Sequence, residues 1–229
     1  DVVRVSQSHH SGLIGDQPEL RIAHYRDPWS GVALLDRAEV PYKTLYEING
    51  LPSIELTHTY PDIAPETLAK IAAMERFCWE RADRIATPAA TLKENLVRLG
   101  APEAKIAVIP NGADVIEAGA ALEGMPAKYL IYFGALQPWQ GIDVLLRAFA
   151  RLRDYDDLHL VICSSTKERR AKRYIKLAAK LEVSERVIWN FRCRQRELRS
   201  WIEHALLSVA PLTECARNLE QGCCPLKIL

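Results

Sequence analysis

The residues of this chain best suited to chemistry lie in a glycine loop between an apolar run and a helical pattern, within residues 129–149. Leu130 to Phe133 form a short apolar run typical of a buried parallel strand, and Gly134 follows it, where the backbone can turn sharply or approach a ligand closely. Apolar side chains then recur at helical spacing, at Ile142, Leu145, Leu146 and Phe149. Such a loop directs free backbone N–H groups at whatever lies before the helix, which suits a phosphate. The glycines follow neither the dinucleotide nor the P-loop pattern, so an ordinary strand-to-helix turn is the alternative.

A second candidate phosphate site lies near the end of the sequence, where Gly222, Cys223 and Cys224 precede a proline and then Lys227. A lysine at the start of a helix opposes the helix dipole, and a bound anion would explain its presence there. Just upstream, the guanidinium of Arg217 has the geometry to grip a phosphate with two hydrogen bonds. The alternative is that both cations are ordinary surface residues.

These loops must be positioned by parallel sheets, because strand and helix patterns alternate along most of the chain. In the second half we predict strands at 129–133, 158–163, 187–191 and 206–210 and helices at 142–153, 168–181 and 195–204. In the first half we predict strands at 21–26, 42–47, 82–87 and 106–109, with helices at 31–37, at 65–82 and from Pro88 to Leu99. An alanine-rich stretch, 113–128, reads as a linker. We therefore expect an α/β fold with two domains, at 1–112 and 129–229, that bind ligands at the carboxyl ends of their strands.

Bulk composition argues against several classes of function. The 30 Lys and Arg nearly balance the 29 Asp and Glu, so no global charge favours nucleic acid. No apolar run approaches the ~20 residues of a transmembrane span, and no signal peptide is visible. The six cysteines form no C-x-x-C pair, so we expect reduced thiols in the cytoplasm. The sequence begins without methionine and stops inside an apolar run, so we expect both ends to be cut.

Three segments resemble, in order and spacing, the GT-B glycosyltransferases, in particular the retaining family usually called family 4. They are A-T-P-A-A-T-L-K-E-N-L with I-P-N-G-A-D at 109–114, then Y-F-G-A-L-Q-P-W-Q-G-I-D-V-L-L-R-A-F-A-R-L, and finally R-N-L-E-Q-G-C-C-P-L-K-I-L at 217–229. Residues 21–60 resemble part of the same family's N-terminal domain. The resemblance implies a GT-B fold of two Rossmann-like parallel-sheet domains that face a cleft, the N-terminal one incomplete and the C-terminal one truncated. It also implies that no metal is required, since helix N-termini and basic side chains carry the charge of the donor diphosphate.

For the donor, the resemblance implies contacts from the C-terminal domain. Lys227 resembles the family lysine that contacts the diphosphate, with Arg217, Asn218 and the backbone of Gly222 to Cys224 beside it. Glu214 is a candidate carboxylate for the donor sugar and for catalysis, although the family's spacing between two glutamates is not met here.

The first glycine loop departs from the family pattern. Gly134 matches the family glycine, but Ala135 and Gln140 stand where many members carry Arg and Lys. We retain Gly134 and Gln140 as donor-site candidates, and we expect this donor site to carry two positive charges fewer than that of many family members. Trp139 is interpreted either as a stacking surface for a sugar or base or as a packing anchor. A D-x-D triplet at Asp154 reads as a loop before a strand, so we expect no metal site there.

For the acceptor side, the resemblance implies residues that follow N-terminal strands. Asn49 stands where many members carry a histidine near the reacting carbon, and an amide can also hydrogen-bond a sugar hydroxyl. Glu47 and Asn49 are therefore the catalytic candidates on this side, and Arg26 and Glu55 are the acceptor-side candidates. Glycine and proline explain the N-G-L-P turn without a function, which is the alternative. His24 is interpreted as a plain strand-end histidine.

The sequence thus predicts a metal-independent, cytoplasmic glycosyltransferase without a cofactor. Its partners would be a nucleotide sugar and a glycan, lipid-linked or small-molecule acceptor, with no nucleic acid. The alternatives are a GT-B nucleotide-sugar epimerase and a non-catalytic nucleotide-sugar-binding module. Residues 167–180 contain seven Lys and Arg, which form either a solvated face or a site for anionic membrane or RNA. Peripheral association with the inner membrane face is therefore a further expectation.

Overall fold

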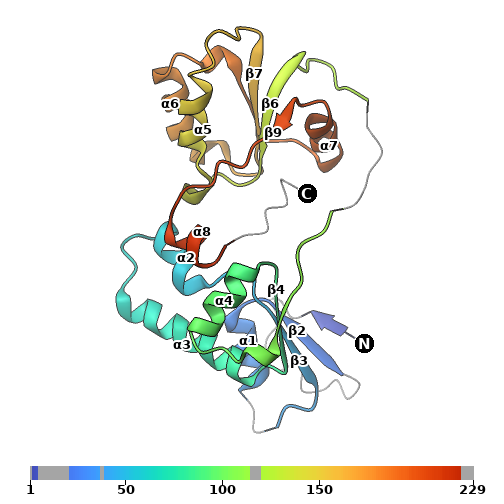
Figure 1. The fold of residues 1–229 in the computed structure, drawn as a ribbon, viewed down its shortest axis with the longest axis vertical. Helices are drawn as coiled ribbons and strands as arrows, with labels where there is room; N and C mark the ends of the chain where they lie inside the picture. The colour runs from blue at the N-terminus through green and yellow to red at the C-terminus, as the bar shows by residue number, and fades with distance from the viewer. Residues whose placement is uncertain (1, 5–20, 37–38, 114–119, 223–229) are drawn as a thin grey trace. The chain divides into compact units, whose positions relative to one another are not determined.

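The computed structural model describes residues 2–4, 21–36, 39–113 and 120–222. These residues form two compact units, each built on its own parallel sheet (Figure 1). Unit 1 contains the described residues up to 111 together with 215–222, and unit 2 contains 112–113 and 120–214. Residues 215–222 therefore belong to unit 1, although they follow residues 120–214 of unit 2 in the sequence.

Unit 1 has a five-stranded sheet in which neighbours along the chain are also neighbours in space. All four pairings are parallel, so the carboxyl ends of the strands share one edge. The strands are β1 (Val2–Arg4), β2 (Ile22–Tyr25), β3 (Lys43–Glu47), β4 (Arg84–Thr87) and β5 (Ile106–Val108).

The helices of unit 1 lie between and after these strands, and α1 packs along α3 (Figure 1). Tyr25 and Tyr46, which are partners across β2 and β3, stack with ring centroids 4.7 Å apart, and Gly31 lets α1 approach Tyr25 and Cys78 closely. The helices are α1 (Pro28–Leu35), α2 (Pro52–Thr59), α3 (Pro65–Arg81), α4 (Ala90–Arg98), the 3-10 turn η2 (Glu103–Lys105) and α8 (Ala216–Glu220).

Unit 2 has a four-stranded parallel sheet in the order β8-β7-β6-β9. The strands are β6 (Lys128–Phe133), β7 (Leu158–Cys163), β8 (Val187–Asn190) and β9 (Leu207–Ser208). The connecting helices are α5 (Ile142–Phe149), α6 (Lys172–Lys180) and α7 (Gln195–Glu203), with 3-10 turns η3 (Pro138–Gln140), η4 (Glu168–Arg170) and η5 (Ser184–Arg186).

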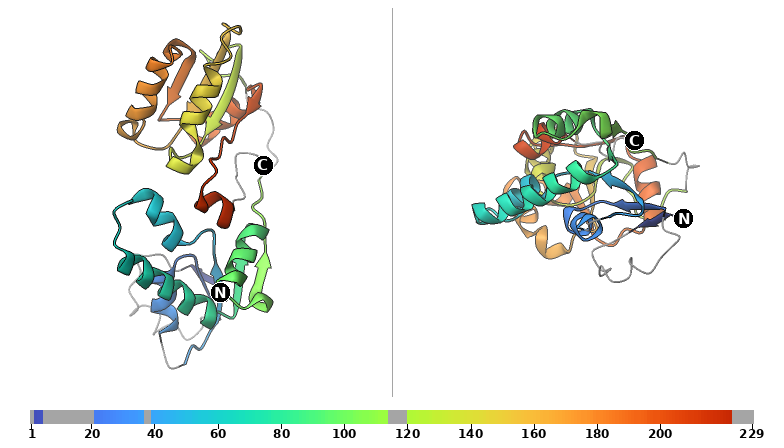
Figure 2. Two further views of the ribbon diagram at one scale, coloured as in Figure 1. Left: turned by 60° about the vertical axis from the view of Figure 1, so that its left-hand side comes forward. Right: turned by 90° about the horizontal axis from the view of Figure 1, so that it is seen from below.

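Helices cover both faces of the unit 2 sheet, as Figures 1 and 2 show. Tyr132 points to the side of α5 and α6, where Phe149 and Tyr174 complete one buried cluster. Its strand neighbour Ile131 points the other way and packs in a second cluster with Trp201 of α7. The alternation along β6 thus explains the three layers, since successive side chains of a strand point to opposite faces.

The expected α/β alternation is confirmed, with differences at the ends of elements. Helix α5 ends at Phe149 rather than at 153, because the chain tightens into a turn in which Arg151 N–H donates to the Ala148 carbonyl. A 3-10 turn precedes α6, so the regular helix begins at Lys172. The expected turn at N-G-L-P runs directly into α2, which the sequence reading missed.

Candidate functional site

The polar residues of unit 1 gather at the carboxyl ends of β2 and β3. These strands pair with Tyr25 opposite Tyr46, so the next residues, Arg26 and Glu47, are neighbours across the sheet. His24 lies two residues before Arg26, and alternation along a strand places both on the same face as Glu47. The register of two parallel strands therefore brings three chemically active side chains together.

Glu47 is the centre of this group. The Arg26 Nε atom lies 2.9 Å from Glu47 Oε1, and the Asn49 side-chain amide donates to the same oxygen at 2.8 Å. His24 Nε2 lies 2.8 Å from Glu47 Oε2. We name Arg26, Glu47, Asn49 and His24 the Glu47 cluster; the first three were expected at the site, and His24 was not.

Partial burial would raise the pKa of Glu47, but its neighbours outweigh that effect. The hydrogen bond from Asn49 and the charges of Arg26 and His24 together hold the pKa below its ordinary value of 4.5. The carboxylate is therefore ionised at neutral pH. The Glu47 side chain is 26% exposed. An ionised group with both oxygens engaged is suited to fix the Asn49 amide and the Arg26 guanidinium in place.

Arg217, expected at the donor site, and Glu55, expected on the acceptor side, lie together within unit 1. Arg217 lies on α8, and its Nε donates to Glu55 Oε1 of α2 at 3.2 Å. The Arg217 side chain is only 14% exposed, and its Nη1 also donates to Asn218 Oδ1 at 3.3 Å. Arg217 thus already has a carboxylate partner.

Gln221 fixes the same segment more firmly, and the sequence reading missed it. Its side chain is fully buried, accepts a hydrogen bond from Leu51 N–H at 2.9 Å and donates to the Leu51 carbonyl at 3.4 Å. Gly50 leaves the necessary room, since a Cβ there would lie 2.6 Å from both Gln221 Oε1 and Glu55 Oε1. In the sequence, a glutamine before a glycine reads only as a polar loop residue.

In unit 2, part of the Gly134 loop is already hydrogen-bonded. Gly134 N–H donates to the Cys163 carbonyl at 3.0 Å, and Leu136 N–H donates to Thr166 Oγ1 at 3.3 Å. The backbone N–H groups available to an anion are therefore not those of Gly134 and Leu136. They are those of the first turn of α5, because this helix begins after Gly141 and no side chain caps it. This turn lies at the carboxyl ends of the strands, where parallel sheets bind ligands.

The end of the same loop is locked to the segment after β9. Gly141 adopts a left-handed conformation with φ of 69°, and a Cβ on it would lie 1.7 Å from the Pro211 carbonyl oxygen. Thr213 N–H donates to the Trp139 carbonyl at 3.1 Å, and Trp139 is buried. Gln140 is half-buried, with its Oε1 3.3 Å from the hydroxyl of Tyr132.

The remaining candidates are less well defined. Glu214 is exposed in the segment between β9 and α8. Cys223, Cys224 and Lys227 lie outside the described residues. Within the described residues, no group of three or more His, Cys, Asp or Glu is arranged to hold a metal ion, and Asp154 is exposed in the loop before β7.

One cavity of unit 1, of about 470 Å³, lies at the other edge of its sheet. Ile22, Leu45 and Asp83 line it, close to the amino ends of β2, β3 and β4. Ligands of parallel sheets usually bind at the carboxyl ends of the strands. The cavity lies at the opposite edge from the Glu47 cluster, so we do not assign it to the candidate site. No helix among the described parts of the chain is long and apolar enough to cross a bilayer.

Comparison with solved structures defines the fold. Anabaena HepE, crystallised in complex with UDP, superposes with a TM-score of 0.62 at 12% identity, covering 89% of this chain and 56% of that one. At 12% identity this similarity establishes the fold alone, which is the GT-B fold with two parallel sheets.

Sequence comparison defines the family. The model described as "Glycosyl transferases group 1" matches residues 119–223, and the one described as "Glycosyl transferase 4-like domain" matches residues 9–112. The uncharacterized glycosyltransferase YqgM of Bacillus subtilis is 30% identical over 65% of this chain and 42% of its own length. The D-inositol 3-phosphate glycosyltransferase of Streptomyces bingchenggensis is 31% identical over 64% of this chain and 36% of its own length. The chain belongs to the group 1 glycosyltransferases and spans less than half the length of these curated relatives.

Proposed function

We propose that the protein transfers a sugar from a nucleotide-diphosphate donor to a glycan, lipid-linked or small-molecule acceptor, in the cytoplasm, with retention of configuration and without metal or cofactor. The observation that carries the proposal is the match of both halves of the chain to models of glycosyl transferase domains. The UDP bound in HepE and the sugar chemistry of the curated relatives support a nucleotide sugar as the donor.

In unit 2, the uncapped first turn of α5 would offer N–H groups to the donor diphosphate. Lys227 and the backbone of Gly222 to Cys224 stay a separate donor-site proposal, and Gly222 belongs to unit 1. The proposed role of Arg217 changes from a phosphate clamp to a fixed anchor for the segment before Gly222, because Glu55 and Asn218 already occupy its guanidinium.

Unit 1 would supply the acceptor-side groups. In the Glu47 cluster, the Asn49 amide and the exposed guanidinium of Arg26 are hydrogen-bond donors held at a carboxyl edge by one ionised carboxylate. Donors fixed in this way recognise hydroxyl or phosphate oxygens.

The test combines donor binding with turnover. A thermal-shift screen of UDP-, GDP- and ADP-sugars should reveal one donor class, because a ligand at 100 times its Kd stabilises the folded state by about 2.7 kcal/mol. Labelled donor of that class, incubated with candidate acceptors, should then yield a glycosylated product. Glu47→Gln should lower turnover with donor affinity kept, while Glu103→Gln, which removes an exposed carboxylate of the Lys93–Glu103 ion pair, should leave both unchanged.

The two alternatives give different results. A nucleotide-sugar epimerase would change the sugar of the labelled donor without any acceptor. A non-catalytic module would bind the donor and produce neither change, and the unmet family spacing between two glutamates near Glu214 is the observation that favours it. Either result in the full-length protein would overturn the proposed transfer.

A further inference from the structure

The charge of this chain is unevenly distributed. Residues 167–180 carry seven Lys and Arg against one Glu, a formal charge of +6. The other residues carry 23 Lys and Arg against 28 Asp and Glu, a formal charge of −5. The near-neutral whole therefore conceals one strongly basic segment, which covers η4 and α6 of unit 2.

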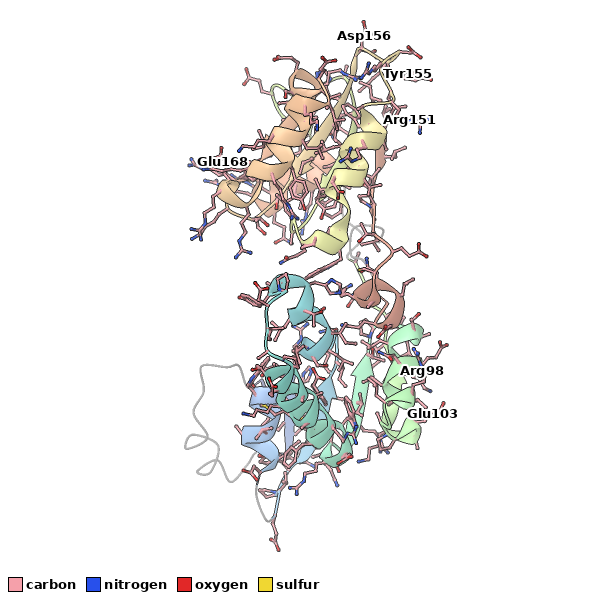
Figure 3. All side chains as sticks on the ribbon, turned by 90° about the vertical axis from the view of Figure 1, so that its left-hand side faces the viewer. Arg98, Glu103, Arg151, Tyr155, Asp156 and Glu168 are labelled. Carbon is pink, nitrogen blue, oxygen red and sulfur yellow. The ribbon has the colours of Figure 1, made fainter. Side chains whose placement is uncertain are left out.

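Helix geometry gathers these charges on one side of α6. At about 100° per residue, Lys172, Arg173, Lys176 and Lys180 fall within an arc of about 100°. All four are exposed, and the 3-10 turn before the helix adds the exposed Arg169 and Arg170. We call these six residues the basic face. Around the labelled Glu168, Figure 3 shows nitrogen-tipped side chains projecting outward from unit 2.

The opposite side of α6 is occupied by the core. Tyr174 and Ala178 are buried against the cluster that contains Phe149, so no apolar side of this helix is available for insertion elsewhere. The Arg173 guanidinium lies 4.4 Å from the centre of the Tyr174 ring and contacts its hydroxyl. In the part of the chain that the structure describes, no residue of the basic face forms an ion pair with a carboxylate.

From this arrangement we infer that the basic face docks unit 2 on a bilayer rich in anionic lipid headgroups. Charge complementarity identifies the partner: cations without a carboxylate partner, on α6 and the 3-10 turn before it, match an anionic surface, and each adds favourable energy near it. A single-stranded nucleic acid would in addition require exposed aromatic rings for stacking. The one aromatic residue of the segment, Tyr174, is buried.

This inference deepens the proposed function, because a docked enzyme would reach a lipid-linked acceptor. The basic run begins just after the carboxyl end of β7, at the same sheet edge as the first turn of α5. Docking by charge alone would be reversible and sensitive to salt, since the Debye length falls to ~3 Å at 1 M. Docking and transfer can fail independently, because vesicle binding requires no donor and no turnover.

The experiment is co-sedimentation of the protein with vesicles of pure phosphatidylcholine and with vesicles that contain phosphatidylglycerol. Binding is expected only to the anionic vesicles and is expected to disappear at high salt. Lys172→Gln, Lys176→Gln and Lys180→Gln together keep helix propensity and remove three charges. This triple variant should weaken binding by roughly a hundredfold, at about fivefold for each charge.

The matched control removes three exposed basic residues from helices of unit 1, as Lys70→Gln, Arg76→Gln and Arg98→Gln. It changes the net charge equally and should bind anionic vesicles like the unmodified protein. The inference is overturned by equal binding to neutral vesicles, by an equal loss in the control, or by unchanged binding in the α6 triple variant. It is also overturned if the triple variant loses affinity only for single-stranded RNA.

Discussion

Gly141 offers a sharp test of how the candidate donor loop is held. Its left-handed φ of 69° costs an alanine about 1–2 kcal/mol relative to glycine. A Cβ at this position would lie 1.7 Å from the Pro211 carbonyl oxygen and 2.9 Å from the carbonyl carbon. Because these are backbone atoms, either the loop or the segment after β9 must move, at a further cost of about 1–3 kcal/mol.

The Gly141→Ala variant should therefore lose about 2–5 kcal/mol of unfolding free energy, the sum of the two effects. Gly124→Ala is the matched control in the same unit, with a φ of 82° and no atom within 4 Å of the new Cβ. It should lose only the backbone part, about 1–2 kcal/mol. The difference between the variants isolates the contact with Pro211.

The assay is thermal and urea unfolding of the full chain, followed by circular dichroism. For a chain of this size, 1 kcal/mol corresponds to about 2–4 °C in Tm, so Gly141→Ala should melt roughly 2–12 °C below Gly124→Ala. Nucleotide affinity should also fall more in Gly141→Ala, because the first turn of α5 follows this residue. Equal melting temperatures for the two variants would refute the argument that Pro211 locks the loop.

Three further outcomes are expected. Lys227→Ala should weaken nucleoside diphosphate binding by roughly ten- to a hundredfold in calorimetry, the value of one charge-assisted contact, and unchanged affinity would exclude Lys227 from the site. Gln221→Ala should lower the urea-unfolding free energy of unit 1 by about 1–3 kcal/mol, because it leaves Leu51 N–H buried without its acceptor, whereas Gln137→Ala at a half-buried loop position should have little effect. Because the pKa of Glu47 is lowered on folding, its contribution to stability is present above the unfolded value near 4.5 and lost as pH falls through the folded value. The stability gap between the unmodified protein and Glu47→Gln should therefore narrow as pH falls below 4.5, and a gap independent of pH would contradict this linkage.

The strands and the main helices follow from patterns within short windows of sequence. The apolar runs of β6 and β7 and the helical period of α5 are local signals, so their existence could be predicted. Helix α2 gave no such signal, because none of its residues is fully buried and its Pro52 reads as part of a turn. At the first helical position, however, proline is well tolerated, which explains the helix that forms there.

In the candidate site, too, contacts between residues far apart in the sequence could not be predicted from local patterns. Arg26, Glu47 and Asn49 could be proposed because residues 21–60 resemble the family's N-terminal domain, and all three lie at or just after the end of a predicted strand. The pairing of Arg217 with Glu55 joins residues 162 positions apart, and no period in the sequence relates them. Gln221 bonds to the backbone of Leu51, and a contact with a backbone group does not depend on the residue type, so the sequence gives no signal for it.

The state of Glu47 also constrains its part in the proposed transfer. A general base works best with a pKa near the working pH, and the neighbours of Glu47 move its pKa in the opposite direction. Its two oxygens face Arg26, Asn49 and His24, so a proton arriving there would displace an existing contact. Glu47 is therefore better suited to hold the Asn49 amide toward a substrate oxygen than to remove a proton. Asn49→Asp would place two carboxylates side by side and should impair transfer more than Asn49→Ala, which removes the amide without adding a like charge.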